Sequence, residues 1–483
     1  MHPRSDVPQL ADVVVVGSAL SGLVAAAILT RHGKRVVVLE HADTVGGRGG
    51  GVRTPDGYWI DFGHRDGHDV GDCQFPWFHG VDAARDADVT VALRPVARPL
   101  RVHRFPDDAM VDAGDWSAEG FLAMARDALE CPPDAVAELA TALARLRGAA
   151  PHDVDAALPV RLDRWLASHV DHPDVRRAIL LLAAVIFHPR PEEASAGRLM
   201  EFLQRPRAGG PFLADDDEVG GMQGLVEPFA RAVRERGGEI ALGRKPVEIL
   251  VTEGRAAGVL AVDRTNLVRE IRAPVVIGTY PLWEHLALLD PLIVPPDLRT
   301  MADALAGCQA DLVGWVAALR RMPRVRATGE LEDFAGWNRL LRGPERRYHG
   351  GWHIPSLSSR RVAPAGRHLL HLVIARFFRG TSGPGETWLA ARARLDDAIG
   401  YLHRYYADLD ACIEWSSYHC VAAPQSMSWA WAPLRRHGIT MPGVRGLLLA
   451  GSTVEGPAAV VDLGAWAGRA AAQEALALLA APT

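Results

Sequence analysis

The sequence predicts an α/β fold that begins with a Rossmann-type βαβ unit. Three observations predict it. A strand, a glycine turn, a helix and a second strand follow one another in residues 13–40; helical patterns fill much of residues 118–187; and α/β patterns return at residues 220–278 and 446–479. A chain of 483 residues has room for about two or three domains.

The composition is that of an ordinary globular protein, with 48% hydrophobic residues, 23% charged residues and a net charge of -5. Because there is no basic block, we expect no nucleic-acid partner, and because no stretch of about 18 apolar residues occurs, we expect no transmembrane helix. The five cysteines form no CxxC pair and no zinc spacing, and residues 1–11 lack the apolar core of a secretion signal. The expectation is a cytoplasmic protein with free thiols and no metal site.

The longest apolar run spans residues 178–187, directly after Arg176 and Arg177. Its length favours a buried helix. The minority interpretation is a patch that dips into a lipid surface, which would give the protein a peripheral membrane contact.

The first motif opens with four valines, Val13–Val16, the pattern of a buried parallel strand. The turn Gly17-Ser18-Ala19-Leu20-Ser21-Gly22 follows, then an apolar helix that ends near Gly33 and a second strand over residues 35–39. Gly17 permits the tight turn, and Gly22 lets helix and strand pack closely. Because a helix begins with unpaired N–H groups and a positive dipole end, this turn predicts a diphosphate site.

Glu40 ends the second strand, where an acid accepts hydrogen bonds from ribose hydroxyls and disfavours a 2′-phosphate. The motif therefore favours FAD or NAD over NADP. Ala19 stands where the middle glycine of such a turn lets the backbone approach the phosphates, and its methyl group narrows that gap. A βαβ unit that binds no nucleotide is the alternative.

The residues after Glu40 carry a family resemblance. His41 is followed by a glycine-rich turn that contains Gly46, Gly47 and Arg48. This run resembles the flavin amine oxidase superfamily, and most closely its phytoene desaturase-like branch. The resemblance implies FAD as cofactor, with the backbone of Gly46 and Gly47 near it and Arg48 facing its phosphate or ribityl region, where a planar guanidinium can hold a phosphate with two bonds. A glycine-rich surface loop with a solvated arginine is the alternative.

A polar cluster continues the matching stretch Asp61-Phe62-Gly63-His64. The resemblance places this stretch close to the flavin, so His64, Arg65 and Asp66 are the candidate catalytic residues. His64 and His68 are spaced for one helical face, but no third metal ligand accompanies them. Ordinary polar loop residues are the alternative interpretation.

Gly220-Gly221-Met222 opens a further helix, which we expect to run to Arg236. Strands are expected over residues 239–242, 247–251, 257–262 and 275–278. The order is similar to a segment of the same family, and that resemblance places Val247 beside the adenosine of FAD.

At the end of the chain, residues 446–451 predict a strand and a tight turn, and Pro457 fits the first turn of an alanine-rich helix. The resemblance places Gly451 and Ser452 at the cofactor. It also points the helix N-terminus at the flavin ring, where a positive dipole end stabilises negative charge.

Three departures from the family pattern bear on flavin binding. Ser452 replaces the usual acid, Ala458-Ala459 replaces the usual glycines, and Ala19 replaces the middle glycine of the first turn. Glu455 is a candidate substitute for the missing acid.

The resemblance implies a Rossmann-type FAD-binding domain, discontinuous in sequence, with an inserted α+β substrate domain. The chain is thereby divided into five segments. The FAD-binding parts are residues 1–75, 215–285 and 436–483, and the substrate-domain parts are residues 76–214 and 286–435. Aromatic residues of the second substrate part, among them Trp337, Trp352 and Tyr401, either line an apolar tunnel or pack in the core, and core packing is the expectation for most of them.

The leading interpretation is an FAD-dependent oxidoreductase of the desaturase or saturase type. It would act on an apolar, isoprenoid-like or polyene substrate by hydride transfer with the flavin. An amine oxidase or a non-redox isomerase on the same fold is one alternative. A non-catalytic protein that binds prenyl groups or lipids without flavin, as Rab GDP-dissociation inhibitors do, is the other.

Overall fold

The structure of the chain is a computed structural model. It describes residues 9–61, 72–73, 78–95, 98, 100–104, 107–113, 117–187, 191–204, 212–214, 216–306, 309–342, 347–378, 388–426, 436–457 and 460–481.

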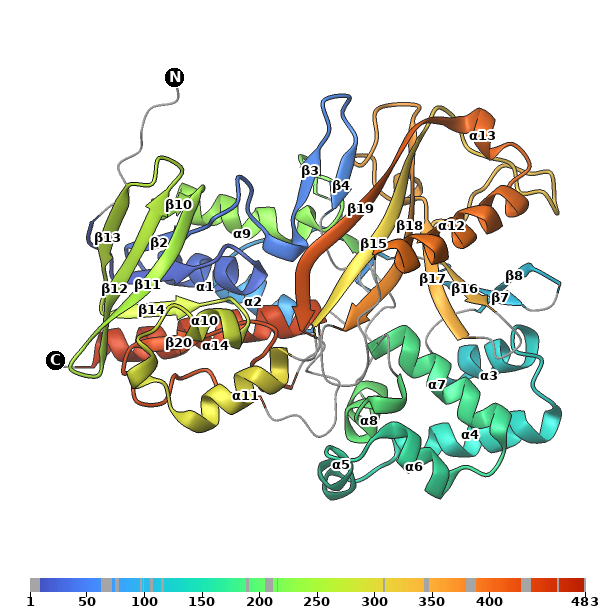
Figure 1. Ribbon diagram of the computed structural model, residues 1–483, viewed down its shortest axis with the longest axis horizontal. Coiled ribbons are helices and arrows are strands. Elements are labelled where there is room, and N and C mark those ends of the chain that lie inside the picture. Colours follow the sequence, from blue (N-terminus) through green and yellow to red (C-terminus); the bar gives the residue numbers. More distant parts are fainter. Residues whose placement is uncertain are drawn as a thin grey trace.

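A five-stranded parallel sheet lies at the centre of the left-hand part of the molecule in Figure 1. Its strand order is β10–β2–β1–β14–β20. The strands are β1 (Val13–Val16), β2 (Val36–Leu39), β10 (Glu239–Ala241), β14 (Val275–Gly278) and β20 (Leu447–Leu449). The predicted strands at these places are confirmed, and they come from both ends and the middle of the sequence.

The two faces of this sheet are covered differently, and the valines of β1 alternate between them. Val13 and Val15 join an apolar cluster with helices on one face, whereas Val14 and Val16 join a second cluster on the other face. The first face carries α1 (Leu20–Arg31), α2 (Phe78–Ala87), α9 (Gln223–Glu235) and α14 (Val460–Ala480). The second carries the antiparallel strands β11 (Arg244–Thr252), β12 (Arg255–Asp263) and β13 (Val268–Arg272) with helices α10 (Leu282–Leu286) and α11 (Pro296–Ala306).

A seven-stranded sheet forms the right-hand part, in the order β19–β15–β18–β17–β16–β7–β8. Its strands are β7 (Leu100–Arg104), β8 (Ala109–Asp112), β15 (Gln309–Leu319), β16 (Trp337–Arg342), β17 (Arg347–His353), β18 (His368–Phe378) and β19 (Ile413–Ser426). Helix α12 (Trp388–Tyr405) packs on one face, where Trp352 and Tyr401 are fully buried. Core packing, not a tunnel, is therefore the role of these two aromatic residues.

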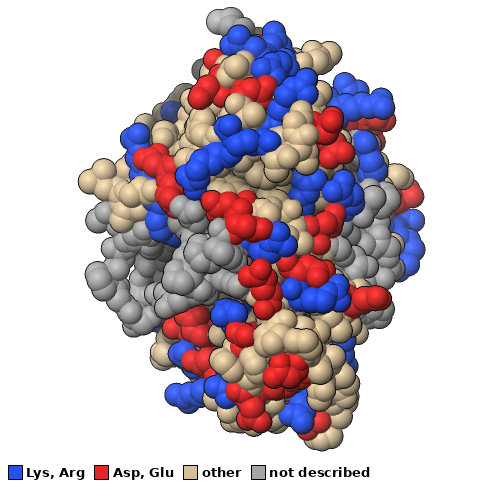
Figure 2. Space-filling model, turned by 90° about the vertical axis from the view of Figure 1, so that its right-hand side faces the viewer, with Lys and Arg blue, Asp and Glu red and all other residues tan. Residues whose placement is uncertain are grey.

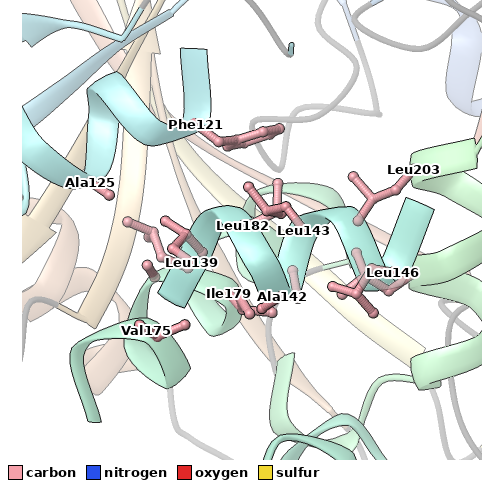
Figure 3. Packing of buried hydrophobic residues seen from close by; sticks show 14 of the residues in the cluster. Phe121, Ala125, Leu139, Ala142, Leu143, Leu146, Val175, Ile179, Leu182 and Leu203 are labelled. Carbon is pink, nitrogen blue, oxygen red and sulfur yellow. The ribbon is translucent and has the colours of Figure 1, made fainter. Parts of the chain in front are cut away.

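A group of helices below this sheet has its own apolar core. The helices are α3 (Ala118–Asp127), α4 (Pro133–Arg147), α5 (Pro151–Ala157), α6 (Leu162–His169), α7 (Pro173–Phe187) and α8 (Ala196–Gln204). Figure 3 shows Leu139 and Leu143 of α4 pointing toward Ile179 and Leu182 of α7. Residues 178–184 of the long apolar run are buried or partly buried here, which favours the buried-helix interpretation.

Short elements connect the two parts. They are the hairpin β3 (Gly51–Arg53) with β4 (Trp59–Asp61), and the strands β5 (Asp72–Cys73), β6 (Leu93–Pro95) and β9 (Phe212–Ala214). Helix α13 (Leu409–Cys412) lies in the right-hand part, between α12 and β19. No helix in the described part of the chain is long and apolar enough to cross a bilayer. The described residues likewise contain no group of three or more metal-ligating side chains.

Helix α14 is described from Val460 onward, and Pro457 lies shortly before that residue. The two residues between them, 458 and 459, lie outside the described residues. The expectation that Pro457 fits the first turn of the helix stays a prediction.

Candidate functional site: a glycine-lined cradle at the ends of the central strands

The turn that leaves β1 forms the first side of the site. Gly17 has a φ of +99°, a backbone conformation that side chains strongly disfavour, and a Cβ there would lie under 3.0 Å from Thr279 Oγ1. A Cβ on Gly22 would lie under 3.0 Å from the carbonyl oxygen of Gly17. The predicted reasons for both glycines, a tight turn and close packing of helix against strand, are confirmed.

Helix α1 then presents its N-terminus. It begins at Leu20, so the N–H groups of Leu20, Ser21 and Gly22 have no acceptor within the helix. Ala19 precedes it in an extended conformation, and the first turn carries no acidic residue. An anion at this end therefore meets donors that the helix leaves unused and the positive end of its dipole.

A second glycine turn faces the first. Gly46 N donates to the Ser18 carbonyl oxygen over 2.9 Å, and Gly46 and Gly47 both have positive φ. A Cβ on Gly47 would point at Ala19 and lie 3.2 Å from the Ala19 Cβ. The methyl group of Ala19 therefore finds room because the residue opposite it is glycine.

Glu40, at the end of β2, is buried and fully hydrogen-bonded. Its Oε2 accepts hydrogen bonds from Ser18 N (2.9 Å) and Ser18 Oγ (2.7 Å). Its Oε1 accepts one from Ala42 N (2.9 Å) and lies 2.9 Å from His41 Nδ1. Burial raises the pKa of Glu40, but these donors together outweigh it and lower the pKa to about 2.

These four donors occupy the positions at which ribose hydroxyls are expected to bind. A carboxylate has about four lone-pair sites, so a ribose hydroxyl must displace a protein donor. His41 is the donor most easily displaced, because its side chain is 63% exposed. The sequence motif shows the acid but not the side chains that surround it.

FAD binding is expected to be pH-dependent through His41. The bond to Glu40 raises the pKa of His41, so a ribose that replaces this bond releases a proton and binds more weakly at low pH. Titration of the apoprotein with FAD, followed by flavin fluorescence, should give about threefold to tenfold weaker binding at about pH 6 than at about pH 9.

A His41→Gln variant should lose most of this pH dependence. His32→Gln is the matched control, because His32 is also exposed but lies in the loop after α1. An equal pH dependence in the His41→Gln variant and the wild type would contradict the role of His41.

Strand β11 forms the rim of the site beside Glu40. Arg244 N donates to the Glu40 carbonyl oxygen over 2.8 Å, which places the start of β11 next to the acid. Val247 follows at a β-bulge and its side chain is 39% exposed. A bulge leaves the extra residue unpaired in the ladder, so Val247 can offer backbone groups and an apolar surface to a ligand.

Asp61 holds the next part of the cradle in place. Its Oδ1 accepts hydrogen bonds from Met222 N and Trp59 Nε1, both over 3.1 Å. Gly221, with a φ of +59°, lies so close that a Cβ would lie under 3.0 Å from the carboxylate. The resemblance placed Asp61 in a flavin-proximal stretch, and the structure shows that it positions the turn before α9.

Gln223, the first residue of α9, carries a buried polar atom that no described residue satisfies. The residue is 4% exposed, and its Oε1 has no hydrogen-bond partner among the described residues. A Cβ on Gly50 would lie 3.5 Å from this atom, so it faces the second glycine turn. An acceptor buried without a partner is costly, and a hydroxyl donor from a ligand would satisfy it.

Several predicted site residues lie outside the described residues. These are His64, Arg65 and Asp66, together with His68. The backbone of Arg48 is described, but its side chain is not.

The end of β20 completes the cradle. A Cβ on Gly451 would lie 2.9 Å from the Thr279 carbonyl oxygen, and Ser452 is half-buried beside it. Glu455 does not stand free to replace the missing acid. It forms ion pairs with Arg198 of α8 and with Arg436, and these two arginines outweigh burial and lower its pKa.

The face of the seven-stranded sheet opposite α12 carries a polar row that was not predicted from the sequence. His353 pairs with His371 across β17 and β18, and His371 Nε2 lies 3.2 Å from His419 Nε2 of β19. Trp337 stacks on His353 with 4.3 Å between the ring centroids. A histidine between leucines of a predicted strand, such as His371 in β18, was the available signal.

Comparison with known proteins identifies the family to which the chain belongs. The family profile described as flavin containing amine oxidoreductase matches residues 20–476, nearly the whole chain. The chain belongs to the flavin-containing amine oxidoreductase family. Members of this family are flavin-containing oxidoreductases, which favours an FAD-dependent enzyme over the non-catalytic alternative.

A curated relative of this amine oxidoreductase family member matches about half of the chain. A phytoene desaturase (neurosporene-forming) of Rhodobacter capsulatus is 28% identical over 289 residues, which cover 53% of this chain and 51% of that protein. The chain thus spans about half the length of this curated relative.

Solved structures share the fold over nearly their whole length. An oxidoreductase from Methanosarcina mazei has a TM-score of 0.70 at 15% identity, covering 95% of this chain and 99% of the other. A putrescine oxidase bound to putrescine has a TM-score of 0.65 at 16% identity, covering 97% and 99%.

The residues present fit FAD, despite the departures from the family pattern. The glycine turns leave an uncovered backbone, α1 supplies N–H donors for a diphosphate, and Gln223 Oε1 lacks a partner. Ala19 faces Gly47, so its methyl group meets no opposing side chain there. The part of FAD that each group would hold follows from this order: the diphosphate at Leu20–Gly22, and the ribose at Glu40.

Proposed function

We propose that this oxidoreductase transfers a hydride between its flavin and a carbon chain of an apolar, isoprenoid-like substrate. The observation that carries the proposal is the relationship to a phytoene desaturase over half of both chains. When bound, FAD supplies the hydride acceptor or donor. The protein's own part is to orient the carbon chain and to exclude water.

The apolar surroundings of the junction between the parts support this proposal. One apolar cluster joins Trp337 and Leu341 of the large sheet, Phe121 and Phe202 of the helices, and Leu463 of α14. These elements meet where α14 begins. A substrate held beside this cluster would contact hydrocarbon side chains from three directions, which favours an apolar carbon chain.

Amine oxidation is the second candidate, and the polar row of His353, His371 and His419 favours it. An amine must lose its ammonium proton before a hydride can leave the adjacent carbon, and an imidazole can accept that proton near neutral pH. A purely apolar substrate carries no ammonium proton for these imidazoles to accept.

Anaerobic reduction of the bound flavin tests the two candidates against each other. The purified holoenzyme is mixed without oxygen with phytoene in detergent micelles, or with putrescine, and its visible absorption is followed. Loss of the flavin band with phytoene but not with putrescine is the expected result. Loss with putrescine alone would replace the proposal by amine oxidation.

A further inference from the structure

A separate pocket opens between the tip of the β3–β4 hairpin and the loop before β18. Its volume is about 920 Å³, a size that suits a small-molecule ligand. It is lined by Arg53, Thr54, Pro55, Asp56, Gly57, Ser356, Ser359, Arg360, Arg361, Ala363, Pro364, Ala365, Gly366, Arg367 and His368. None of these residues belongs to the flavin cradle.

The lining carries an excess of positive charge. It contains four arginines and one carboxylate, that of Asp56, which already accepts a hydrogen bond from Trp415 Nε1 over 2.7 Å. Arg367 forms an ion pair with Glu414. No salt bridge to any described residue is made by Arg53, Arg360 or Arg361, and all three are exposed.

This excess is a local feature. The whole chain has a net charge of -5, and the face drawn in Figure 2 shows Lys and Arg mixed with Asp and Glu over most of its area. Three arginines that pair with no described carboxylate repel one another in one concave lining and raise the local positive potential. An anion that enters the pocket relieves this repulsion.

The scaffold of the pocket is held by backbone hydrogen bonds and buried contacts. Trp59 N donates to the Val362 carbonyl oxygen, and Arg367 N donates to that of Pro364, each over 2.9 Å. Val362 is 1% exposed, so the loop is anchored beneath the arginines. The charged groups therefore extend from a fixed frame, which reduces the entropy lost when a ligand binds.

Hydroxyl groups add donors of the kind that bind phosphate oxygens. Ser356 Oγ lies 3.2 Å from His368 Nδ1 and Ser359 is buried at the base of the loop. Guanidinium forks and hydroxyls together match a tetrahedral oxyanion with several acceptor oxygens better than a single carboxylate.

We propose that this pocket binds the phosphate groups of a phosphate ester. The ester is either a free metabolite or the headgroup of an anionic lipid, since both present the same oxyanion. This binding role is independent of the substrate proposed for the flavin site. The base of the pocket nevertheless lies close to the turn before α9, because a Cβ on Gly220 would lie 3.0 Å from the Arg361 backbone.

Calorimetric titration of the holoenzyme with inorganic pyrophosphate tests the proposal. The wild type is expected to bind with an affinity that falls as salt rises. A variant with Arg53→Gln, Arg360→Gln and Arg361→Gln should bind at least about tenfold more weakly. Its flavin spectrum and unfolding temperature should match those of the wild type, because these side chains are exposed and form no ion pair with a described residue.

A matched control removes the same charge elsewhere. Arg255→Gln, Arg269→Gln and Arg445→Gln replace three exposed arginines near the antiparallel sheet on the other side of the molecule. This variant should bind pyrophosphate like the wild type. No binding by the wild type, or equal weakening in both variants, overturns the proposal.

Sedimentation with phosphatidylcholine vesicles, with and without phosphatidic acid, separates the two sources of phosphate. Arginine-dependent sedimentation with phosphatidic acid assigns the pocket to a lipid headgroup. Pyrophosphate binding without sedimentation assigns it to a free ester. Sedimentation that survives in the pocket variant overturns the assignment to a headgroup.

Discussion

A Gly22→Ala variant is expected to be destabilised and to lose its FAD. The new methyl group would lie under 3.0 Å from the Gly17 carbonyl oxygen and 3.1 Å from Val15 Cγ1, so α1 must move away from β1. Overpacking of this kind costs about 1–3 kcal/mol, and here the obstacle is a backbone oxygen that cannot rotate away. Moving α1 also moves the N–H groups that would hold the diphosphate.

Chemical denaturation and the flavin content after purification measure the two effects. Gly464→Ala is the control, because Gly464 also lies in a helix but a Cβ there would have no neighbour closer than 3.9 Å. That change should be neutral or stabilising by about 0.5–1 kcal/mol, since alanine is the better helix former. A Gly22→Ala protein as stable and as yellow as the control would refute the close packing described for this turn.

A Glu40→Gln variant is expected to be less stable than the wild type and to bind FAD more weakly. Both carboxylate oxygens accept hydrogen bonds, so the amide NH2 of glutamine must face N–H or O–H donors on one side. FAD affinity should fall as well, because the amide cannot accept on both sides from ribose hydroxyls.

The pH dependence of stability isolates this carboxylate. Because the folded-state pKa of Glu40 is lowered from 4.5 to about 2, its stabilising effect is complete above about pH 4.5 and is lost as the pH falls toward 2. The shift corresponds to about 3 kcal/mol of unfolding free energy. Denaturation curves at several pH values should show this loss in the wild type and a smaller one in the variant; identical slopes would contradict it.

The first βαβ unit could be predicted from sequence almost residue by residue. Four successive valines identify β1, and Gly17 and Gly22 occupy positions where local geometry admits no side chain. Such local constraints are visible in sequence because neighbouring residues produce them. The burial of Glu40 under Ser18 and His41 is also local, but it depends on side-chain rotamers that no spacing rule describes.

Contacts between distant segments could not be predicted in the same way. Glu455 was a candidate for a vacant acid position, but it pairs with Arg198, which lies 257 positions earlier in the chain. The polar row of His353, His371 and His419 comes from three strands whose register only the folded sheet defines. The large sheet itself mixes strands from residues 100–112 with others beyond residue 309, and no local pattern shows that pairing.

The order of strands in the central sheet has a consequence for biosynthesis. β1 and β2 leave the ribosome early, but β14 of the same sheet ends at Gly278, and β20 begins only at Leu447. At about 5–20 residues per second, roughly 20 to 80 s pass between translation of β2 and translation of β20. During that interval the valine-rich strands have an incomplete sheet, so we expect the nascent chain to need chaperone protection and to acquire its flavin only once β20 has been translated.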